Sequence, residues 1–382
     1  MVRTTPKSFA IQLNRKECVT GCPETGRGFK FWALAKLPAW LLTKNQIPLF
    51  YTAEMSNGGE ITCCNCWTLY AKVEDGPIKN DTIVTLDVAT GSLLDHWGSN
   101  LFYMPHGLEV DAEGNTWFTD VALHQVFKLP LVIDGHLRLG SRVVPSLTLG
   151  EAFVPGSDEK HFCKPTDVAV SSSGIFFVSD GYCHKRIMKF DSNGRLLNVY
   201  TRSFNIVHSL TLQEEKDALC VTDRENSRVV CIHAGLKEGP GQPSFGSPYG
   251  PAGYKGKNVG RVFAVAAKGQ QLYAVFGSIF LGMSDGKTFD LDSLNTLSRW
   301  IPSKGFGSPH DVAVSRDGSV IVRAYLCWRQ QRRCWCSRKD ATNMKMNKRE
   351  MNTVVPIQQR LQNQPKYPKC GTDDQDRARR MP

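Results

Sequence analysis

Three histidines stand at equal intervals along the chain and could together hold a metal ion. His106, His208 and His310 are each separated from the next by 102 residues, and two of the three directly follow a proline. Three neutral imidazoles with an open fourth position are the arrangement of a catalytic zinc site, where the metal polarises a substrate oxygen. The alternative is that they are ordinary residues of the protein interior, whose imidazoles form hydrogen bonds with the backbone around a central channel. Three histidines in register favour the zinc site.

The histidines recur because the sequence around them recurs. Each copy begins with a His or Thr that follows Pro or Val. Alternating apolar residues, a tight turn, an apolar strand that usually ends in Asp, and a further strand come after it. Four copies are clear: MPHGLEVDAEGNTWFTDVALHQVFKL from Met104, KPTDVAVSSSGIFFVSDGYCHKRIMKF from Lys164, IVHSLTLQEEKDALCVTDRENSRVVCI from Ile206 and SPHDVAVSRDGSVIV from Ser308. Each copy predicts two or three short strands joined by turns.

Two fainter copies extend the series. GRVFAVAAKGQQLYAVFG from Gly260 lies between the third and fourth clear copies, and TIVTLDVATGSLLDHW from Thr82 precedes the first. The pattern predicts an all-β fold, a six-bladed NHL-type β-propeller whose first and last blades are poorly matched. The first strand of each blade would line the central channel, so histidines from alternate blades would converge on its axis.

The formal charge of +11 is concentrated at one end of the chain. Residues 323–382 hold 15 Lys and Arg against 5 Asp and Glu, which leaves 32 against 31 for residues 1–322. A near-neutral body argues against a basic groove for nucleic acid, and the tail lacks regularly spaced aromatic residues for stacking on RNA bases. We therefore expect no nucleic-acid partner.

The hydropathy pattern predicts no membrane span, because the chain has no run of about 18 apolar residues. The first residues, MVRTTPKSFAIQLNRKEC, lack the apolar core of a signal peptide. The segment from Phe29 to Leu42 is apolar but contains two lysines and a proline. This composition favours a packing segment over a displaced signal or anchor.

The cysteines indicate an oxidising compartment. Of the 13 cysteines, four lie within the repeats, namely Cys163, Cys183, Cys220 and Cys231. Their separations of 20 and 11 residues suit two local disulfides, whereas zinc-finger spacing is absent there.

These motifs closely resemble the peptidyl-α-hydroxyglycine α-amidating lyase family. The strings that carry the resemblance are FYMPHGLEVDAEGNTWFTDVALHQVFKL, HFCKPTDVAV, VSDGYCHKRI, VTDRENSR and SPHDVAVSRDGSV, within residues 76–322. The resemblance implies a zinc-dependent lyase that cleaves a peptidyl-α-hydroxyglycine substrate into a peptide amide and glyoxylate.

The resemblance also assigns roles to single residues. His106, His208 and His310 would bind zinc, and Tyr182 would be the base that takes the proton of the substrate hydroxyl. A free tyrosine has a pKa of about 10, so nearby positive charge must favour the phenolate. Arg224 would orient the substrate and steady the developing charge. Without the resemblance, Tyr182 would be interpreted as a strand-end aromatic and Arg224 as a solvated surface charge.

Further sites follow from the same resemblance. Asp311 and Leu108 match two ligands of a structural calcium ion in the channel. Cys163 with Cys183, and Cys220 with Cys231, match the two disulfides of the family. A secretory or extracellular location is implied as well. Separately, Asn80-Asp81-Thr82 is a possible glycosylation sequon.

The ends of the chain depart from the family pattern. We divide the chain into a divergent N-terminal segment (1–75), a β-propeller lyase domain (76–322) and a basic, disordered tail (323–382). The family's first-blade arginine, in a stretch resembling HRGD, and a third calcium ligand are not found before Gly76. The alternative function is therefore a catalytically impaired NHL-type propeller that acts as a binding module. The oligomeric state cannot be inferred from the sequence.

Overall fold

The structure of the chain is a computed structural model. It describes residues 8–10, 30–34, 46–52, 73–87, 93–130, 144–237, 239–251, 254–255, 260–277, 284–302, 306, 308–314, 318, 320–325, 328–330 and 333–335. The chain divides into two units, residues 1–346 and 347–382, of which the second lies outside the described residues.

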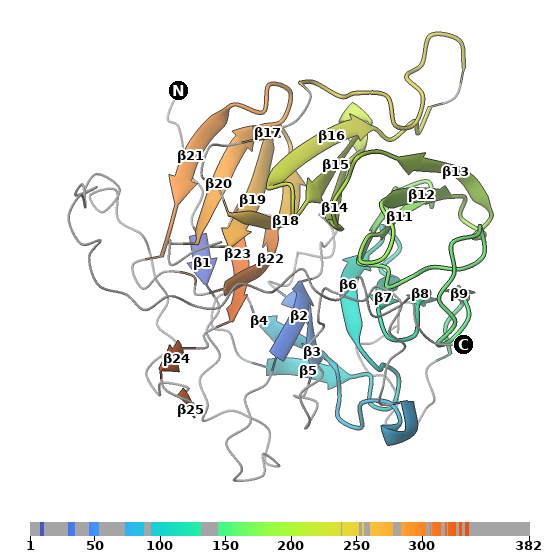
Figure 1. The fold of residues 1–382 in the computed structure, drawn as a ribbon, viewed down its shortest axis with the longest axis vertical. Coiled ribbons are helices and arrows are strands. Elements are labelled where there is room, and N and C mark those ends of the chain that lie inside the picture. The colour runs from blue at the N-terminus through green and yellow to red at the C-terminus, as the bar shows by residue number, and fades with distance from the viewer. Residues whose placement is uncertain are drawn as a thin grey trace, which may run out of the picture. The chain divides into compact units, whose positions relative to one another are not determined.

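Antiparallel strands, consecutive in sequence, form five four-stranded sheets in the part of the chain that the structure describes (Figure 1). The first sheet contains β2 (Lys30–Leu34), β3 (Gln46–Thr52), β4 (Ile83–Asp87) and β5 (Leu93–Trp97). The second contains β6 (Pro105–Val110), β7 (Thr116–Asp120), β8 (Gln125–Leu129) and β9 (Leu147–Leu149). The third contains β10 (Asp167–Val170), β11 (Phe176–Asp180), β12 (Arg186–Phe190) and β13 (Leu196–Thr201).

The fourth sheet contains β14 (Val207–Gln213), β15 (Ala218–Asp223), β16 (Arg228–His233) and β17 (Tyr254–Lys255). The fifth contains β18 (Arg261–Lys268), β19 (Gln271–Gly277), β20 (Asp285–Asp290) and β21 (Thr296–Trp300). A three-stranded sheet joins β22 (Ser308–Val314), β23 (Val320–Tyr325) and β1 (Ser8–Ala10), with β1 parallel to β23. The remaining described elements are a hairpin of β24 (Trp328–Gln330) and β25 (Arg333–Trp335) and two single 3₁₀ turns, η3 (Val73–Asp75) and η4 (Glu214–Lys216).

One strand from each of the six larger sheets takes part in a closed series of contacts. β2 contacts β6, and the series continues through β10, β14, β18 and β22, which in turn contacts β2. Figure 1 shows these sheets arranged around a common centre. This is the arrangement of a β-propeller, in which closure of the ring removes free sheet edges.

Short polar turns define the ends of the strands. In the turn between β6 and β7, the Asp111 carboxylate accepts the backbone N–H groups of Glu113 and Asn115, and Gly114 has φ +87°. Glycine adopts this left-handed conformation without the steric cost of a side chain. Asp191 and Gly194 repeat the same turn between β12 and β13.

Aromatic side chains fill the space between neighbouring sheets. Trp117 on β7 lies 4.6 Å from Phe176 on β11, and Phe176 stacks on Phe190 of β12 at 5.0 Å, measured between ring centroids. All three side chains are buried. Because such interiors are close-packed, they hold the inner strands, and therefore the channel residues, in a fixed relation.

The predicted all-β propeller is confirmed, while the number of blades stays a prediction. Strands β2 and β3 come from the segment predicted to be divergent; β2 pairs with β3, and β3 pairs with β4 in the same sheet. The predicted tail lies largely outside the described residues. Among the described residues, no helix has both the length and the apolar character needed to cross a membrane.

Candidate active site and metal centre

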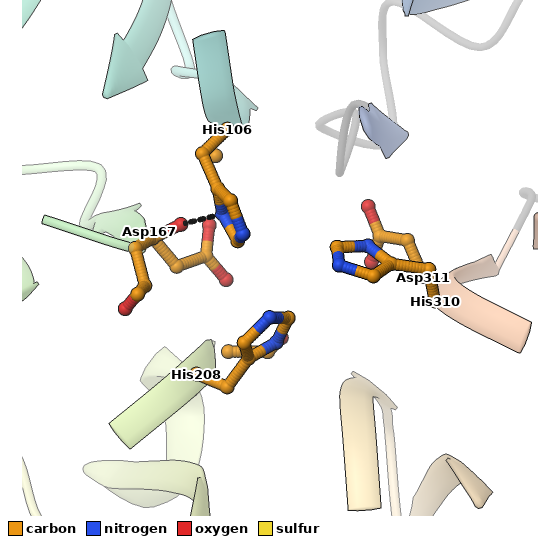
Figure 2. Close-up of a pocket in the computed structure, with 8 residues that line it drawn as sticks. His106, Asp167, His208, His310 and Asp311 are labelled. Carbon is orange, nitrogen blue, oxygen red and sulfur yellow. Dashed lines mark hydrogen bonds between the residues drawn. The ribbon is translucent and has the colours of Figure 1, made fainter. Parts of the chain in front are cut away.

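Three inner strands bring the three histidines together on the axis. His106 lies on β6, His208 on β14 and His310 on β22, which belong to alternate sheets of the ring. One nitrogen from each imidazole lies within 4.8 Å of the others, and no other group of three or more potential metal ligands occurs in the described part of the chain. Figure 2 shows the three rings facing one another across the pocket.

Each histidine stands at an irregularity in its strand. The register shifts between Pro105 and Leu108 on β6, between Val207 and Leu210 on β14, and between Pro309 and Asp311 on β22. A β-bulge of this kind re-aims a side chain that a regular strand would direct against the neighbouring sheet. The bulges therefore turn the imidazoles toward the channel.

Threonine hydroxyls from the neighbouring strands satisfy the backbone at two of the bulges. The Gly107 N–H donates to Thr119 Oγ1 at 2.8 Å, and the Ser209 N–H donates to Thr222 Oγ1 at 2.9 Å. Gly107 also has to be a glycine, because a Cβ there would lie 2.6 Å from the Cα of Asp167. The residue after each of these two histidines is thus fixed by its surroundings.

Backbone carbonyls fix the tautomer of two histidines. His106 Nδ1 lies 2.6 Å from the carbonyl oxygen of Thr166, and His208 Nδ1 lies 2.7 Å from that of Phe263. A carbonyl can only accept, so each Nδ1 carries the proton, and in the neutral ring Nε2 keeps its lone pair. Each bond reaches the next sheet of the ring. This pattern of carbonyl-anchored imidazoles is typical of metal-binding histidines.

All three imidazoles are buried, and burial favours the neutral form of His208. The exposed fractions of His106, His208 and His310 are 3%, 2% and 8%. Burial, followed by the neighbouring His310, His106 and Arg224, lowers the pKa of His208 well below its usual value, although its bond to Phe263 opposes the change. A neutral imidazole is the form that binds a metal ion.

Tyr182 places its hydroxyl between two of the imidazoles. Tyr182 Oη lies 2.9 Å from His106 Nε2 and 3.3 Å from His208 Nε2. The residue before it, Gly181, follows β11 at a point where a Cβ would lie 1.7 Å from the Val207 carbonyl oxygen. Only glycine fits there, and this close approach brings the tyrosine to the axis.

Arg224 lies beside Tyr182 and is not a solvated surface charge. Its exposed fraction is 6%. The guanidinium carbon lies 5.5 Å from the centroid of the Tyr182 ring and 5.4 Å from that of Phe263. A cation at these distances is attracted to the ring faces. The structure therefore places Tyr182 against two of the histidines and Arg224 beside Tyr182.

Other residues form a second layer of the pocket. Gly107, Ser209 and Asp311, which each follow a histidine, line it together with Thr166, Asp167 and the three imidazoles, and Figure 2 labels Asp167 and Asp311 there. Asp167 Oδ2 accepts the N–H of Leu210 at 2.8 Å, which ties β10 to β14. Of the two predicted calcium ligands, Asp311 lies in this layer, and Leu108 lies on β6 with an exposed fraction of 1%.

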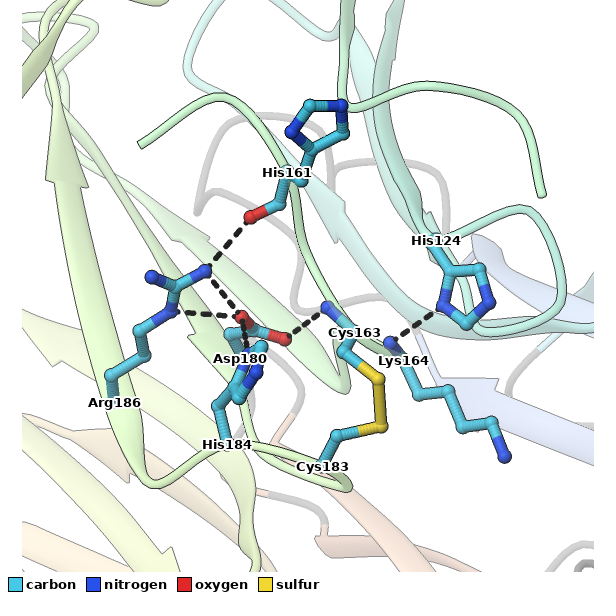
Figure 3. Close-up of a disulfide and its surroundings, with 8 residues drawn as sticks. All are labelled: His124, His161, Cys163, Lys164, Asp180, Cys183, His184 and Arg186. Carbon is cyan, nitrogen blue, oxygen red and sulfur yellow. Dashed lines mark hydrogen bonds and ion pairs between the residues drawn. A yellow bond between two sulfur atoms is a disulfide. The ribbon is translucent and has the colours of Figure 1, made fainter. Parts of the chain in front are cut away.

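A disulfide joins the turn that carries Tyr182 to the loop before β10. The predicted pairs are joined, Cys163 to Cys183 and Cys220 to Cys231. Figure 3 shows that the first bridge lies next to the buried Asp180, which accepts the Cys163 N–H at 2.9 Å and bonds Arg186 Nε at 2.9 Å. The bridge and the ion pair hold the Tyr182 turn from two sides.

Buried aspartates position the loops before other inner strands. Asp120, at the end of β7, accepts the N–H groups of Tyr103 and Met104, just before His106. Burial raises the pKa of Asp120, although four backbone hydrogen bonds oppose the change. Asp223, at the end of β15, likewise accepts the Asn205 N–H at 2.6 Å. Asp120, Asp180 and Asp223 end the strings FTD, VSD and VTD, so the repeat in the sequence already indicates an aspartate at this position.

Two other contacts of the site could not be predicted from the sequence pattern. Phe263 stands on β18 at the position that corresponds to the histidines and supplies a carbonyl to His208. Glu225 binds Arg224 with Oε1 at 2.9 Å.

Asn80, the predicted glycosylation site, is exposed, whereas Thr82 of its sequon is buried and donates to the Gly98 carbonyl.

The class of protein is given by the fold together with a family match. The NHL repeat family matches residues 162–190, which include β10, β11 and β12. The repeated sheets and this match define an NHL-type β-propeller with a cluster of histidines on its axis.

Comparison with curated proteins narrows the class to one family. The chain is 42% identical over 269 residues to peptidyl-alpha-hydroxyglycine alpha-amidating lyase 2 of Drosophila melanogaster. The aligned region covers 69% of this chain and 62% of the relative. It is 40% identical over 255 residues to a probable peptidyl-alpha-hydroxyglycine alpha-amidating lyase of Caenorhabditis elegans, which covers 65% of this chain and 68% of the relative. The chain belongs to the peptidyl-α-hydroxyglycine α-amidating lyase family.

Other relatives are longer than this chain. Peptidyl-glycine alpha-amidating monooxygenase A of Xenopus laevis is 42% identical over 264 residues, which cover 65% of this chain and 26% of the relative. The chain thus matches less than two thirds of the length of the Drosophila and Xenopus relatives.

Proposed function

We propose that the chain is a zinc-dependent lyase that cleaves a peptidyl-α-hydroxyglycine into a C-terminally amidated peptide and glyoxylate. The observation that carries this proposal is the convergence of three buried imidazoles, with the Tyr182 hydroxyl 2.9 Å from one and 3.3 Å from another. The names of the relatives support the same activity.

The donor set fits zinc. His106, His208 and His310 would hold the ion through three neutral nitrogens, and the carbonyl oxygens of Thr166 and Phe263 orient two of the rings. Bound there, the zinc would polarise the hydroxyl oxygen of the substrate. A site with three protein ligands leaves a coordination position for that oxygen, which is typical of catalytic zinc.

Tyr182 is the base in this proposal. As a phenolate it removes the proton of the substrate hydroxyl, whose C–O bond becomes the C=O of glyoxylate. The bond between the α-carbon and the amide nitrogen breaks, the electron pair stays on nitrogen, and a proton completes the peptide amide. No oxidant or reductant is consumed.

Arg224 stabilises the negative charge in this step. Its guanidinium stands 5.5 Å from the Tyr182 ring in a buried environment, where a fixed cation interacts more strongly than in water. It would favour the phenolate before the reaction and steady the carboxylate of the substrate during it.

A structural calcium ion belongs to the same proposal. Asp311 would bind it through the side chain and Leu108 through the backbone carbonyl, since oxygen ligands suit calcium. The two disulfides support a secretory or extracellular location. Glycosylation of Asn80 would have to precede folding, because Thr82 is buried in the folded chain.

The test is the identity of the products. A synthetic peptidyl-α-hydroxyglycine is incubated with the purified chain, and the peptide is followed by mass spectrometry while glyoxylate is measured in the same sample. We expect equal amounts of peptide amide and glyoxylate. A folded, zinc-loaded chain that binds the peptide but releases neither product would instead support the alternative, a propeller that acts as a binding module.

A further inference from the structure

An ion-pair chain leads from the solvent to Tyr182. Arg224 Nε donates to Glu225 Oε1 at 2.9 Å, and Nη2 forms an ion pair with the same oxygen at 2.9 Å. The other carboxylate oxygen, Oε2, accepts a bond of 2.7 Å from Arg261 Nε on β18. The exposed fraction of the side chain rises along this chain, from 8% for Arg224 through 18% for Glu225 to 49% for Arg261.

We propose that Glu225 is a positioning residue of the site, which holds the Arg224 guanidinium between the rings of Tyr182 and Phe263. This inference rests on the proposed lyase function, because it is through Arg224 that Glu225 would affect turnover. In the described part of the chain, the hydrogen bonds and ion pairs of the Glu225 side chain go to Arg224 and Arg261, of which only Arg224 is assigned to the chemistry.

The packing around Arg224 explains why a counter-ion is needed. The guanidinium lies over two aromatic faces, 5.5 Å from the Tyr182 centroid and 5.4 Å from the Phe263 centroid, and neither ring offers a carboxylate. A buried cation without a partner is costly, so its side chain would turn toward solvent if the partner were removed. Glu225 offsets that cost by accepting from a guanidinium N–H group, in the plane of the guanidinium, which leaves the contacts with the two rings in place.

The bond to Arg261 holds Glu225 itself in place. Glu225 follows the end of β15, and its N–H donates to the Asn205 carbonyl at 3.0 Å, so its backbone is anchored to the loop before β14. Its side chain is then fixed from the next sheet by Arg261. One carboxylate between two guanidinium groups also prevents their mutual repulsion, which would otherwise displace Arg224.

The test is a double-mutant cycle between Glu225→Gln and Arg224→Ala, read from kcat and KM separately. We expect Glu225→Gln to lower kcat about 10-fold or more, the value of a charge-assisted hydrogen bond, with a change in KM of less than about 3-fold. In the Arg224→Ala background the same substitution should have no further effect, because Glu225 acts only through Arg224.

A matched control is available in the same hairpin. Glu214 lies at the opposite end of β14 and β15, where its carboxylate accepts bonds from Ser172. Glu214→Gln makes the same chemical change away from the site and should leave kcat unchanged. The melting temperature of every variant shows whether it is folded.

The outcomes separate this inference from the proposed function. If the wild-type chain turns over and Glu225→Gln has the wild-type kcat, or if the two substitutions multiply in their effects, Glu225 is not a positioning residue. If the wild-type chain does not turn over, the proposed function fails, and the cycle is read from melting temperatures. Coupling between Glu225 and Arg224 then supports the positioning geometry, and strictly additive effects overturn it.

Discussion

The replacement Tyr182→Phe removes one oxygen atom from the centre of the site and leaves the ring. The ring centroid lies 5.3 Å from that of His106 in an edge-to-face contact, and the Arg224 cation lies 5.5 Å from the ring. Phenylalanine can keep both contacts. The substitution therefore tests the hydroxyl and not the shape of the pocket.

The magnitude follows from the two roles of the hydroxyl. As a general base it accounts for about 10²-fold to 10⁴-fold in rate, so kcat should fall by at least about 100-fold. In the folded chain the hydroxyl lies 2.9 Å from His106 Nε2 and 3.3 Å from His208 Nε2, and its one proton can be donated to either; the net contribution of such a bond to the free energy of unfolding is about 1 kcal/mol. We thus expect a large loss of activity with a small loss of stability.

The assay is initial-rate release of glyoxylate under saturating substrate, with zinc content measured on the same samples. Tyr249→Phe serves as the control. The Tyr249 hydroxyl donates to Asp292 Oδ1 over 2.6 Å, and this pair lies away from the site, so the substitution also removes one hydroxyl and its hydrogen bond. The control should keep the wild-type kcat. If Tyr182→Phe retains wild-type kcat with normal zinc content, Tyr182 is not the base.

Three further outcomes are expected. His208→Ala should abolish stoichiometric zinc binding, measured by elemental analysis after dialysis, because it removes one of three imidazole ligands. Gly181→Ala should lower the melting temperature by about 5 °C or more, since its Cβ would lie 1.7 Å from the Val207 carbonyl oxygen; an unchanged value would contradict the close approach. Burial lowers the pKa of His124 to about 4, below the value of about 6.5 in the unfolded chain. The neutral imidazole therefore contributes to the free energy of unfolding above about pH 6.5, and this contribution, up to about 3 kcal/mol, is lost as the pH falls toward 4. His124→Asn, which tolerates the local φ of +58°, should reduce the difference between urea midpoints at pH 7 and pH 4.5, and an equal difference in both proteins would refute this assignment.

The repeat made the propeller predictable from the sequence. The alternation of apolar residues and the turns at Gly114 and Gly174 define β6, β7, β10 and β11 locally, so each blade could be recognised by itself. The convergence of the histidines could be predicted from their equal spacing, because three copies of one position in alternate sheets of a propeller meet at the axis.

Contacts between sheets could not be predicted in the same way. The bond from His208 to the Phe263 carbonyl depends on which strand lies beside β14, and the approach of Gly181 to Val207 depends on how closely two sheets pack. Neither leaves a local pattern in the chain. Strands β2 and β3 were also missed, because residues 1–75 do not follow the motif of the repeat, although both strands join a sheet with β4.

The most direct test of the central claim is lyase turnover of the chain before zinc removal, after removal with a chelator, and after zinc is restored. Our account predicts release of glyoxylate that is lost with the chelator and recovered in proportion to the zinc bound. Turnover that persists after complete removal of zinc would contradict the role assigned to His106, His208 and His310. A folded chain with stoichiometric zinc and no turnover would contradict the lyase function itself.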